Sequence, residues 1–204
     1  MYLLIEGMPC TGKTTISKRI AQQIGAQYMK SVVSDTTIGN YLKLLRQQDQ
    51  KTLEYFHIVD SLIDELKVRK ILDTGYDLVR DKCFVSSMAH LLTHGVINDT
   101  EPYKSFVWEA YDQLVKYSVT PDLVILMEPD IDAIKQHISE KKDLSDVDKM
   151  LLSNQDLYKS QHETLKTKLD EMYEDKVLSI LSFSKSLDDT CQYIIDELKK
   201  RTLI

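Results

Sequence analysis

The stretch YLLIEGMPCTGKTT, residues 2–15, decides the fold of this chain. A short apolar run, residues 2–6, leads directly into a loop that contains two glycines, and from Lys13 onward apolar residues recur at helical spacing. Gly25 stands where a residue in the left-handed conformation would end that helix. The sequence therefore predicts a strand, a tight loop and a helix as the opening unit of the fold.

The loop fits the phosphate-binding pattern Gly-x-x-x-x-Gly-Lys-Thr, or P-loop, in its usual place between a strand and a helix. Glycines allow backbone N–H groups to turn inward around phosphate oxygens, and the helix adds the positive end of its dipole. We therefore expect the loop and the first helical turn to bind the phosphates of a nucleotide. The expected binding residues are Gly7, Met8, Pro9, Cys10, Thr11, Gly12, Lys13, Thr14 and Thr15.

Two of these side chains have a predicted chemical role. Lys13 supplies a point charge for the β and γ phosphates, and the Thr14 hydroxyl can ligate a Mg²⁺ ion that bridges them. ATP and Mg²⁺ are therefore the expected cofactors. The alternative without function is a glycine-containing turn followed by a surface lysine. The strand before the loop and the helix after it argue against this alternative. A GTP-binding switch would need a base-reading Asn-Lys-x-Asp sequence, and the chain has none.

Short apolar strands alternate with helices along the rest of the chain. Further strands are expected at residues 28–33, 77–80, 122–127 and 176–181. Helices are expected at residues 38–48, 51–70, 84–94, 103–117, 131–141, 158–173 and 187–201. This alternation predicts an α/β fold, with a five-stranded parallel sheet covered by helices on both faces.

Composition limits the classes of protein to which the chain can belong. Its 204 residues, 43% hydrophobic and 28% charged, predict a single domain over residues 1–204. A net charge of −6 provides no overall positive field for a nucleic acid polymer or an anionic membrane. With no basic leader and no run of 18 apolar residues, a cytoplasmic location is expected. Three widely spaced cysteines predict reduced thiols.

Beyond the loop, the chain resembles the thymidylate kinase family and its deoxynucleoside kinase relatives over residues 2–158. Residues 5–7, IEG, resemble the family's Phe-Glu-Gly opening, and residues 81–90, DKCFVSSMAH, resemble its Asp-Arg-Tyr-x-x-Ser-x-x-Ala-Tyr segment. Residues 121–126, PDLVIL, resemble its Pro-Asp-Leu strand, and residues 154–158, NQDLY, match the helix after the lid more loosely. The resemblance implies a P-loop kinase fold with a short lid, a small nucleotide or nucleoside as acceptor, and a homodimer.

The resemblance also gives Asp81 a place in the mechanism. This residue follows a strand, at the edge of the sheet where such folds bind ligands. There it would orient the attacking oxygen or hold the Mg²⁺ shell, and it could take the proton of a nucleoside hydroxyl, whereas an ionised phosphate acceptor needs no base. The alternative is that Asp81 caps the helix that starts at Phe84.

Four further residues are expected to line the acceptor site. Lys82 stands where the family has an arginine that contacts the acceptor, and it keeps the charge but not the bidentate fork. Phe56 lies where the family stacks an aromatic ring on the base, with a place in the core as an equal alternative. Ser86 and His90 fall one turn apart on one helix, so both are expected to face the acceptor. His90 replaces a family tyrosine, and the alternative for it is a core histidine.

Departures from the family pattern put thymidylate specificity in doubt. Pro9 replaces a residue that is often acidic, and residues 31–34, SVVS, replace an Arg-Glu-Pro segment. Asp60 stands where the family offers an arginine suited to a thymine carbonyl. Because a carboxylate accepts hydrogen bonds, Asp60 favours a base with an amino group, which adenine, guanine and cytosine have.

The lid departs from the family as well. Residues 139–148, SEKKDLSDVD, form an almost wholly polar segment without arginine, which is either a flexible lid or a solvated connection. Lys141 and Lys142 are the candidates to close over the γ-phosphate and supply charge in the transition state, with a solvated charge run as an equal alternative. Glu128, just after a strand, would either act near Mg²⁺ through water or cap the next helix.

The expected function is that of an ATP-dependent nucleoside monophosphate kinase of thymidylate kinase type, which transfers the γ-phosphate of ATP to a nucleotide or deoxynucleotide. A deoxynucleoside kinase that phosphorylates a 5′-hydroxyl is one alternative. A kinase of another small metabolite is a second. A nucleotide-binding paralogue without catalysis is a third, although Lys13, Thr14 and Asp81 argue against it.

Overall fold

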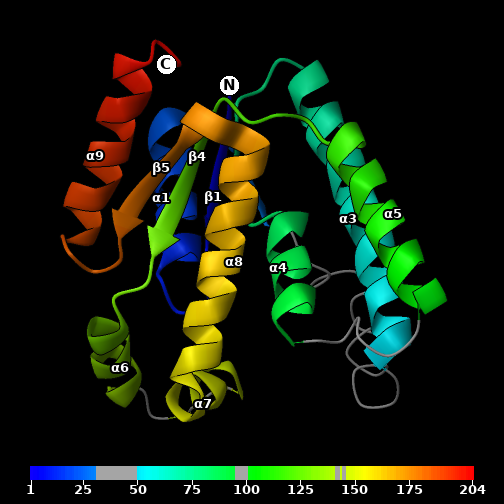
Figure 1. The fold of residues 1–204 in the computed structure, drawn as a ribbon. Coiled ribbons are helices and arrows are strands. Elements are labelled where there is room, and N and C mark those ends of the chain that lie inside the picture. Colours follow the sequence, from blue (N-terminus) through cyan, green and yellow to red (C-terminus); the bar gives the residue numbers. More distant parts are fainter. Residues whose placement is uncertain (31–49, 95–100, 141–142, 144–145) are drawn as a thin grey trace.

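The computed structural model describes residues 1–30, 50–94, 101–140, 143 and 146–204, and of residues 50–57, 94, 101–105, 146–148 and 150 only the backbone. Its centre is a sheet of five parallel strands in the order β2-β3-β1-β4-β5. The strands are β1 (Tyr2–Gly7), β2 (Gln27–Lys30), β3 (Leu78–Asp81), β4 (Leu123–Glu128) and β5 (Val177–Leu181). Helices cover the sheet on two sides (Figure 1). The predicted fold class is thus confirmed.

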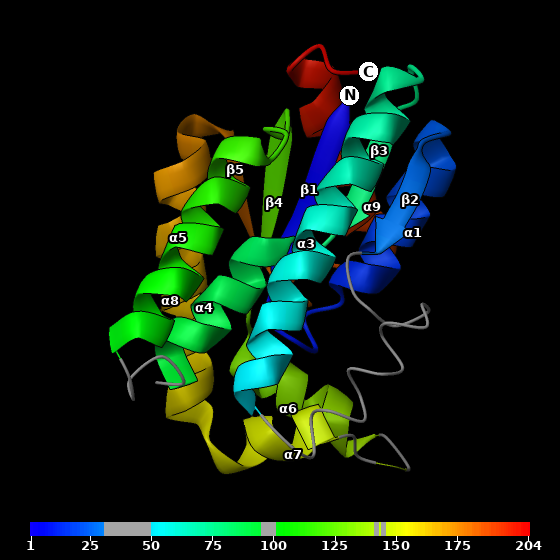
Figure 2. The same cartoon turned by 90° about the vertical axis from the view of Figure 1, so that its right-hand side faces the viewer.

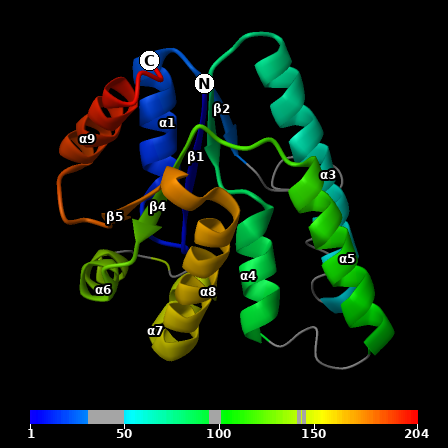
Figure 3. The same ribbon diagram turned by 45° about the horizontal axis from the view of Figure 1, so that its top comes forward.

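Two helices cover the first face of the sheet, α1 (Lys13–Ile24) and α9 (Leu187–Lys200). Figure 3 shows them side by side, and apolar residues at helical spacing turn from both helices toward the strands. Alternate residues of β1 point to this face, as the pleat of a strand requires. The core here includes Leu3, Ile5, Ile16, Ile20, Val79, Ile125, Ile194 and Leu198.

Four helices lie on the second face, and Figure 2 is viewed from their side of the molecule. They are α3 (Gln50–Asp73), α4 (Phe84–His94), α5 (Glu101–Tyr117) and α8 (Gln155–Tyr173). The other residues of the central strands point toward them. This second core includes Leu4, Leu78, Val124, Leu126, Phe84, Met88, Leu165 and Leu169.

Local signals in the sequence explain where several helices begin and end. Gly25 ends α1 in the left-handed conformation, with φ 72°, as predicted. Asp130 begins α6 (Ile131–Ser139), because its side chain accepts a hydrogen bond from the Ala133 amide at 3.0 Å. Glu128 is therefore not the cap of this helix. No helix within the described ranges is long and apolar enough to cross a bilayer.

The region after α6 differs from the sequence prediction. A helix that was not predicted, α7 (Asp146–Ser153), takes up the end of the polar segment 139–148 and continues beyond it. The side chain of Asn154 caps α8 by accepting from the Leu157 amide at 3.1 Å, so α8 starts earlier than predicted. A single-turn 3-10 helix, η1 (Glu174–Lys176), then leads into β5.

A buried ion pair joins α3 to the sheet. Arg80 of β3 is 1% exposed, and its Nη1 atom donates to Glu65 Oε1 at 2.5 Å and to the Tyr2 hydroxyl at 3.2 Å. The other Glu65 oxygen accepts from the Val119 amide at 3.3 Å. These hydrogen bonds offset the cost of removing both charges from water. Alternation along β3 thus sends Arg80 toward α3, on the face opposite to that of its neighbour Asp81.

We predict that Glu65→Ala lowers the free energy of unfolding by about 3–5 kcal/mol, because it leaves the Arg80 guanidinium buried without its carboxylate. Urea denaturation measures the change. The matched control is Glu171→Ala, which removes the carboxylate of an exposed pair with Lys168 and should cost at most about 1 kcal/mol. Equal losses in the two variants would contradict a structural role for the buried pair.

Candidate active site

The phosphate-binding pattern forms a loop between the end of β1 and the start of α1. Gly7 has φ 148°, and a Cβ at this position would lie 2.8 Å from the Met127 carbonyl oxygen of β4, so the strands can approach only with glycine here. Gly12 has φ 82° and precedes the first turn of α1. Cys10 has φ 67°, a conformation that costs an ordinary residue about 1–2 kcal/mol.

Lys13 folds back over this loop. Its Nζ atom donates to the Met8 carbonyl at 3.1 Å. Burial lowers the pKa of Lys13, and the nearby positive charge of Lys82 lowers it further, while Asp81 and Glu6 act in the opposite direction. The net effect is a lowered pKa, so an anion bound beside Lys13 would stabilise its charged form.

Asp81 lies at the carboxyl end of β3, next to the start of α1. Its Oδ2 atom accepts from the Thr14 hydroxyl at 2.6 Å and from the Tyr28 hydroxyl at 3.3 Å. Burial, followed by the Asp81 charge, raises the pKa of Tyr28 to about 12. The carboxylate is 1% exposed, and its Oδ1 atom has no hydrogen-bond partner among the described residues.

These contacts exclude one of the two roles expected for Asp81. Its hydrogen bonds go to Thr14 and Tyr28, not to the first amides of α4, so it does not cap that helix. A buried carboxylate oxygen without a donor, beside a hydroxyl, is a donor set that suits a hard cation such as Mg²⁺. The predicted pair of Thr14 and Asp81 is thus brought together.

Glu6, for which no role was predicted, lies beside the phosphate-binding loop. It is fully buried at the end of β1 and accepts from the Cys83 amide at 2.6 Å, the Ser86 hydroxyl at 2.6 Å and the Gly7 amide at 3.3 Å. Ser86, expected at the acceptor, is 6% exposed and donates its hydroxyl to Glu6. The sequence does carry a signal for this role: Glu6 ends an apolar run, and a carboxylate that is buried there needs hydrogen-bond donors.

Lys82 is held in a turn between β3 and α4. It has φ 75°, and its amide donates to the Ile5 carbonyl at 3.0 Å. The next amide, that of Cys83, is bound by Glu6, so β1 fixes this left-handed turn on both sides of Lys82. Its positive charge is near enough to lower the pKa of Lys13.

The other predicted acceptor residues are less completely described. His90 is half-buried on α4, one turn beyond Ser86. Phe56 lies on α3, and its side chain is outside the described residues. Lys141 and Lys142 also lie outside the described residues.

Glu128 turns toward α8. Its Oε1 atom accepts from Lys166 Nζ at 2.8 Å, and its Oε2 atom lies 3.7 Å from His162 Nε2. Burial raises the pKa of Glu128, but its hydrogen bonds and the Lys166 charge outweigh burial and leave the pKa lowered. The carboxylate is thus engaged by α8, which does not favour the predicted role near Mg²⁺.

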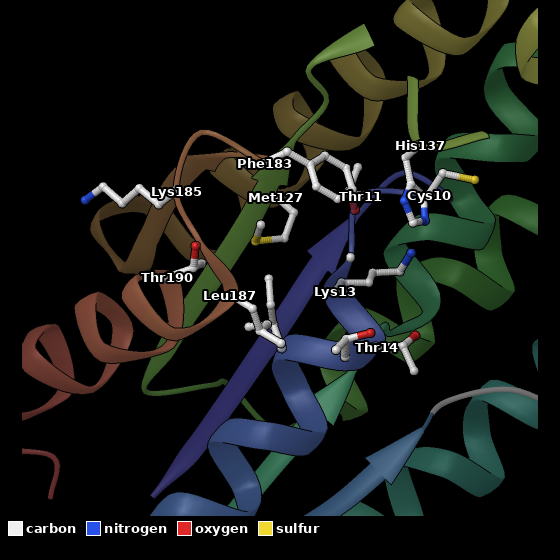
Figure 4. A pocket seen from close by; sticks show the side chains of 13 residues that line it. Cys10, Thr11, Lys13, Thr14, Met127, His137, Phe183, Lys185, Leu187 and Thr190 are labelled. Atoms are coloured by element: carbon white, nitrogen blue, oxygen red, sulfur yellow. The ribbon is translucent and has the colours of Figure 1, made fainter. Parts of the chain in front are cut away.

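A pocket of about 440 Å³ adjoins the phosphate-binding loop. Its walls come from the loop, the end of β4, α6, the connection after β5 and the start of α9 (Figure 4). The rings of His137 and Phe183 stack at its edge, 5.6 Å apart and inclined by 29°. This volume is typical of a small-molecule site. Neither aromatic residue was predicted, although Phe183 follows a strand at the edge where ligands bind.

The chain was compared with family models, curated proteins and solved structures. No family model matches the chain, but curated relatives do. A probable thymidylate kinase of Methanocaldococcus jannaschii is 28% identical over 162 residues, which cover 78% of this chain and 79% of that protein. One of Methanococcus maripaludis strain C6 is 26% identical over 147 residues, covering 70% and 68%.

Two solved structures share the fold. The thymidylate kinase of Candida albicans superposes with a TM-score of 0.75 at 17% identity, covering 98% of this chain and 92% of that one. The deoxyadenosine kinase of M. mycoides superposes with a TM-score of 0.70 at 14% identity, covering 98% and 100%. These structures show that the fold is shared, and the sequence matches confirm the resemblance seen in the sequence: this chain is similar to proteins described as probable thymidylate kinases.

Proposed function

We propose that the protein is an ATP-dependent nucleoside monophosphate kinase, which transfers the γ-phosphate of ATP to a nucleotide or deoxynucleotide. The observation that carries this proposal is the hydrogen bond of 2.6 Å from the Thr14 hydroxyl to Asp81, which joins the phosphate-binding loop beside Lys13 to the strand end that Lys82 follows. Such an arrangement can position two phosphates and neutralise their charge, which is most of the catalysis that phosphoryl transfer requires.

The donor would occupy the loop and the adjoining pocket. The loop amides and Lys13 would bind the phosphates of ATP, and the nucleoside would lie in the pocket that His137 and Phe183 border. Thr14 and Asp81 would hold Mg²⁺, which when bound neutralises charge on the β and γ phosphates. The unpartnered Asp81 oxygen supports this assignment.

The charges of the site favour an acceptor that already carries a phosphate. Burial and then the Lys82 charge lower the pKa of Lys13, and bound anionic phosphates would favour the charged form of this lysine. The Glu6 carboxylate is taken up by three hydrogen-bond donors, so it is not placed to serve as a base. An ionised phosphate needs no base, and Lys82 would bind it as a point charge.

A nucleoside 5′-hydroxyl is the second candidate acceptor. The observation in its favour is the same Asp81 oxygen, which could accept a proton instead of ligating a cation.

For either acceptor, the base would be recognised by α3, where Asp60 is 8% exposed. As a hydrogen-bond acceptor, Asp60 supports adenine, guanine or cytosine over thymine.

A homodimer is the proposed assembly. Val59, Leu62 and Leu66 of α3 follow one another at helical spacing and are 50%, 42% and 50% exposed in the single chain. A second copy of the chain would bury this stripe.

In sedimentation velocity at micromolar concentration we expect one species of twice the chain mass, and Leu62→Lys should shift it toward the monomer. A wild-type monomer would contradict the assembly.

We predict that one nucleoside monophosphate accelerates the release of ADP from Mg·ATP by the purified protein. The panel should pair each common monophosphate with its nucleoside, and if Asp60 reads the base, the best acceptor should bear an amino group. Lys13→Ala, which removes charge from the donor phosphates, should lower kcat by at least about a hundredfold. Acceleration by a nucleoside alone would select the second candidate, and a flat panel would exclude both kinases.

A further inference from the structure

A tyrosine from a distant helix is bonded to the phosphate-binding loop. The Tyr158 hydroxyl of α8 donates to the Pro9 carbonyl at 2.5 Å, across 149 positions of sequence. Its side chain is 1% exposed, and burial raises its pKa, so the hydroxyl keeps its proton at neutral pH. The Asn154 cap places Tyr158 in the first turn of α8. The position of the hydroxyl is therefore set by the start of this helix.

The geometry of the peptide bond links this contact to the inside of the loop. The Pro9–Cys10 peptide is trans, because the described chain has no cis bond. In a trans peptide the carbonyl and the following N–H point in opposite directions. Fixing the Pro9 carbonyl on Tyr158 therefore directs the Cys10 N–H away from α8. Cys10 itself lines the pocket beside the loop.

The residue that follows the Pro9 carbonyl, Cys10, has a strained backbone conformation. Cys10 adopts φ 67°, which glycine accepts readily and a residue with a Cβ does not. Contacts within the loop hold the preceding peptide, since Thr11 Oγ1 and Lys13 Nζ both donate to the Met8 carbonyl. The Pro9 carbonyl is held from outside the loop, by Tyr158. The peptide that precedes the strained residue is thus bound by α8.

We propose that Tyr158 is a positioning residue for nucleotide binding. By holding the Pro9 carbonyl, it keeps Cys10 in the left-handed conformation and its amide aimed at the bound phosphates. It also couples α8, which follows the segment 139–148 and α7, to the donor site. The inference rests on the proposed function only in that the loop binds ATP.

A double-mutant cycle tests this role. The dissociation constant of Mg·ATP is measured by calorimetry for wild type, Tyr158→Phe, Cys10→Gly and the double variant. Tyr158→Phe keeps the ring in the core and should weaken ATP binding about fivefold, the typical effect of one lost hydrogen bond. With glycine at position 10 the conformation is no longer strained, so removing the hydroxyl should then cost less than about twofold.

Tyr173→Phe is the control, because Tyr173 is also buried on α8 but lies at the opposite end of the helix. It should leave ATP binding unchanged. If Tyr158→Phe binds ATP like wild type, or loses the same factor whether residue 10 is cysteine or glycine, the positioning role is wrong. A wild-type protein that binds no ATP would instead overturn the proposed function.

Discussion

The parallel pairing of β1 with β3 is the constraint on which the site depends. Its register places Ile5 beside Asp81, and because parallel strands run in one direction, their carboxyl ends meet at one edge of the sheet. The phosphate-binding loop leaves β1 at that edge and the turn at Lys82 leaves β3. Two short contacts cross the junction, from Thr14 to Asp81 and from Cys83 to Glu6. A shift of one residue in this register would separate both pairs.

The junction is held in conformations that the chain would not adopt alone. Cys10 and Lys82 both have positive φ angles, and each lies beside a peptide group that another element binds. Glu6 of β1 secures the turn at Lys82, and Tyr158 of α8 secures the loop at Cys10. The strain is thus offset by buried hydrogen bonds. Under the proposed function, these bonds would preorganise the backbone groups of the loop for anionic ligands.

The sequence predicted those parts of the protein that rest on local signals. The five strands follow from short apolar runs, the end of α1 from Gly25, and the loop between β1 and α1 from the spacing of one motif. The contacts of Glu6, the Arg80–Glu65 pair and the Tyr158–Pro9 bond join residues that are far apart in the chain, so no local pattern reveals them. The helix α7 was missed because its polar start reads as a continuation of the loop.

The central claim is that Thr14 and Asp81, brought together by β1 and β3, bind the metal that accompanies ATP. Calorimetry of ATP binding with Mg²⁺ and with EDTA, for wild type and Asp81→Asn, tests it most directly. We predict that Mg²⁺ strengthens ATP binding to wild type by at least about tenfold and that Asp81→Asn loses most of this gain. An unchanged gain in Asp81→Asn would contradict the account, because the metal would then be held without the residue around which the site is arranged.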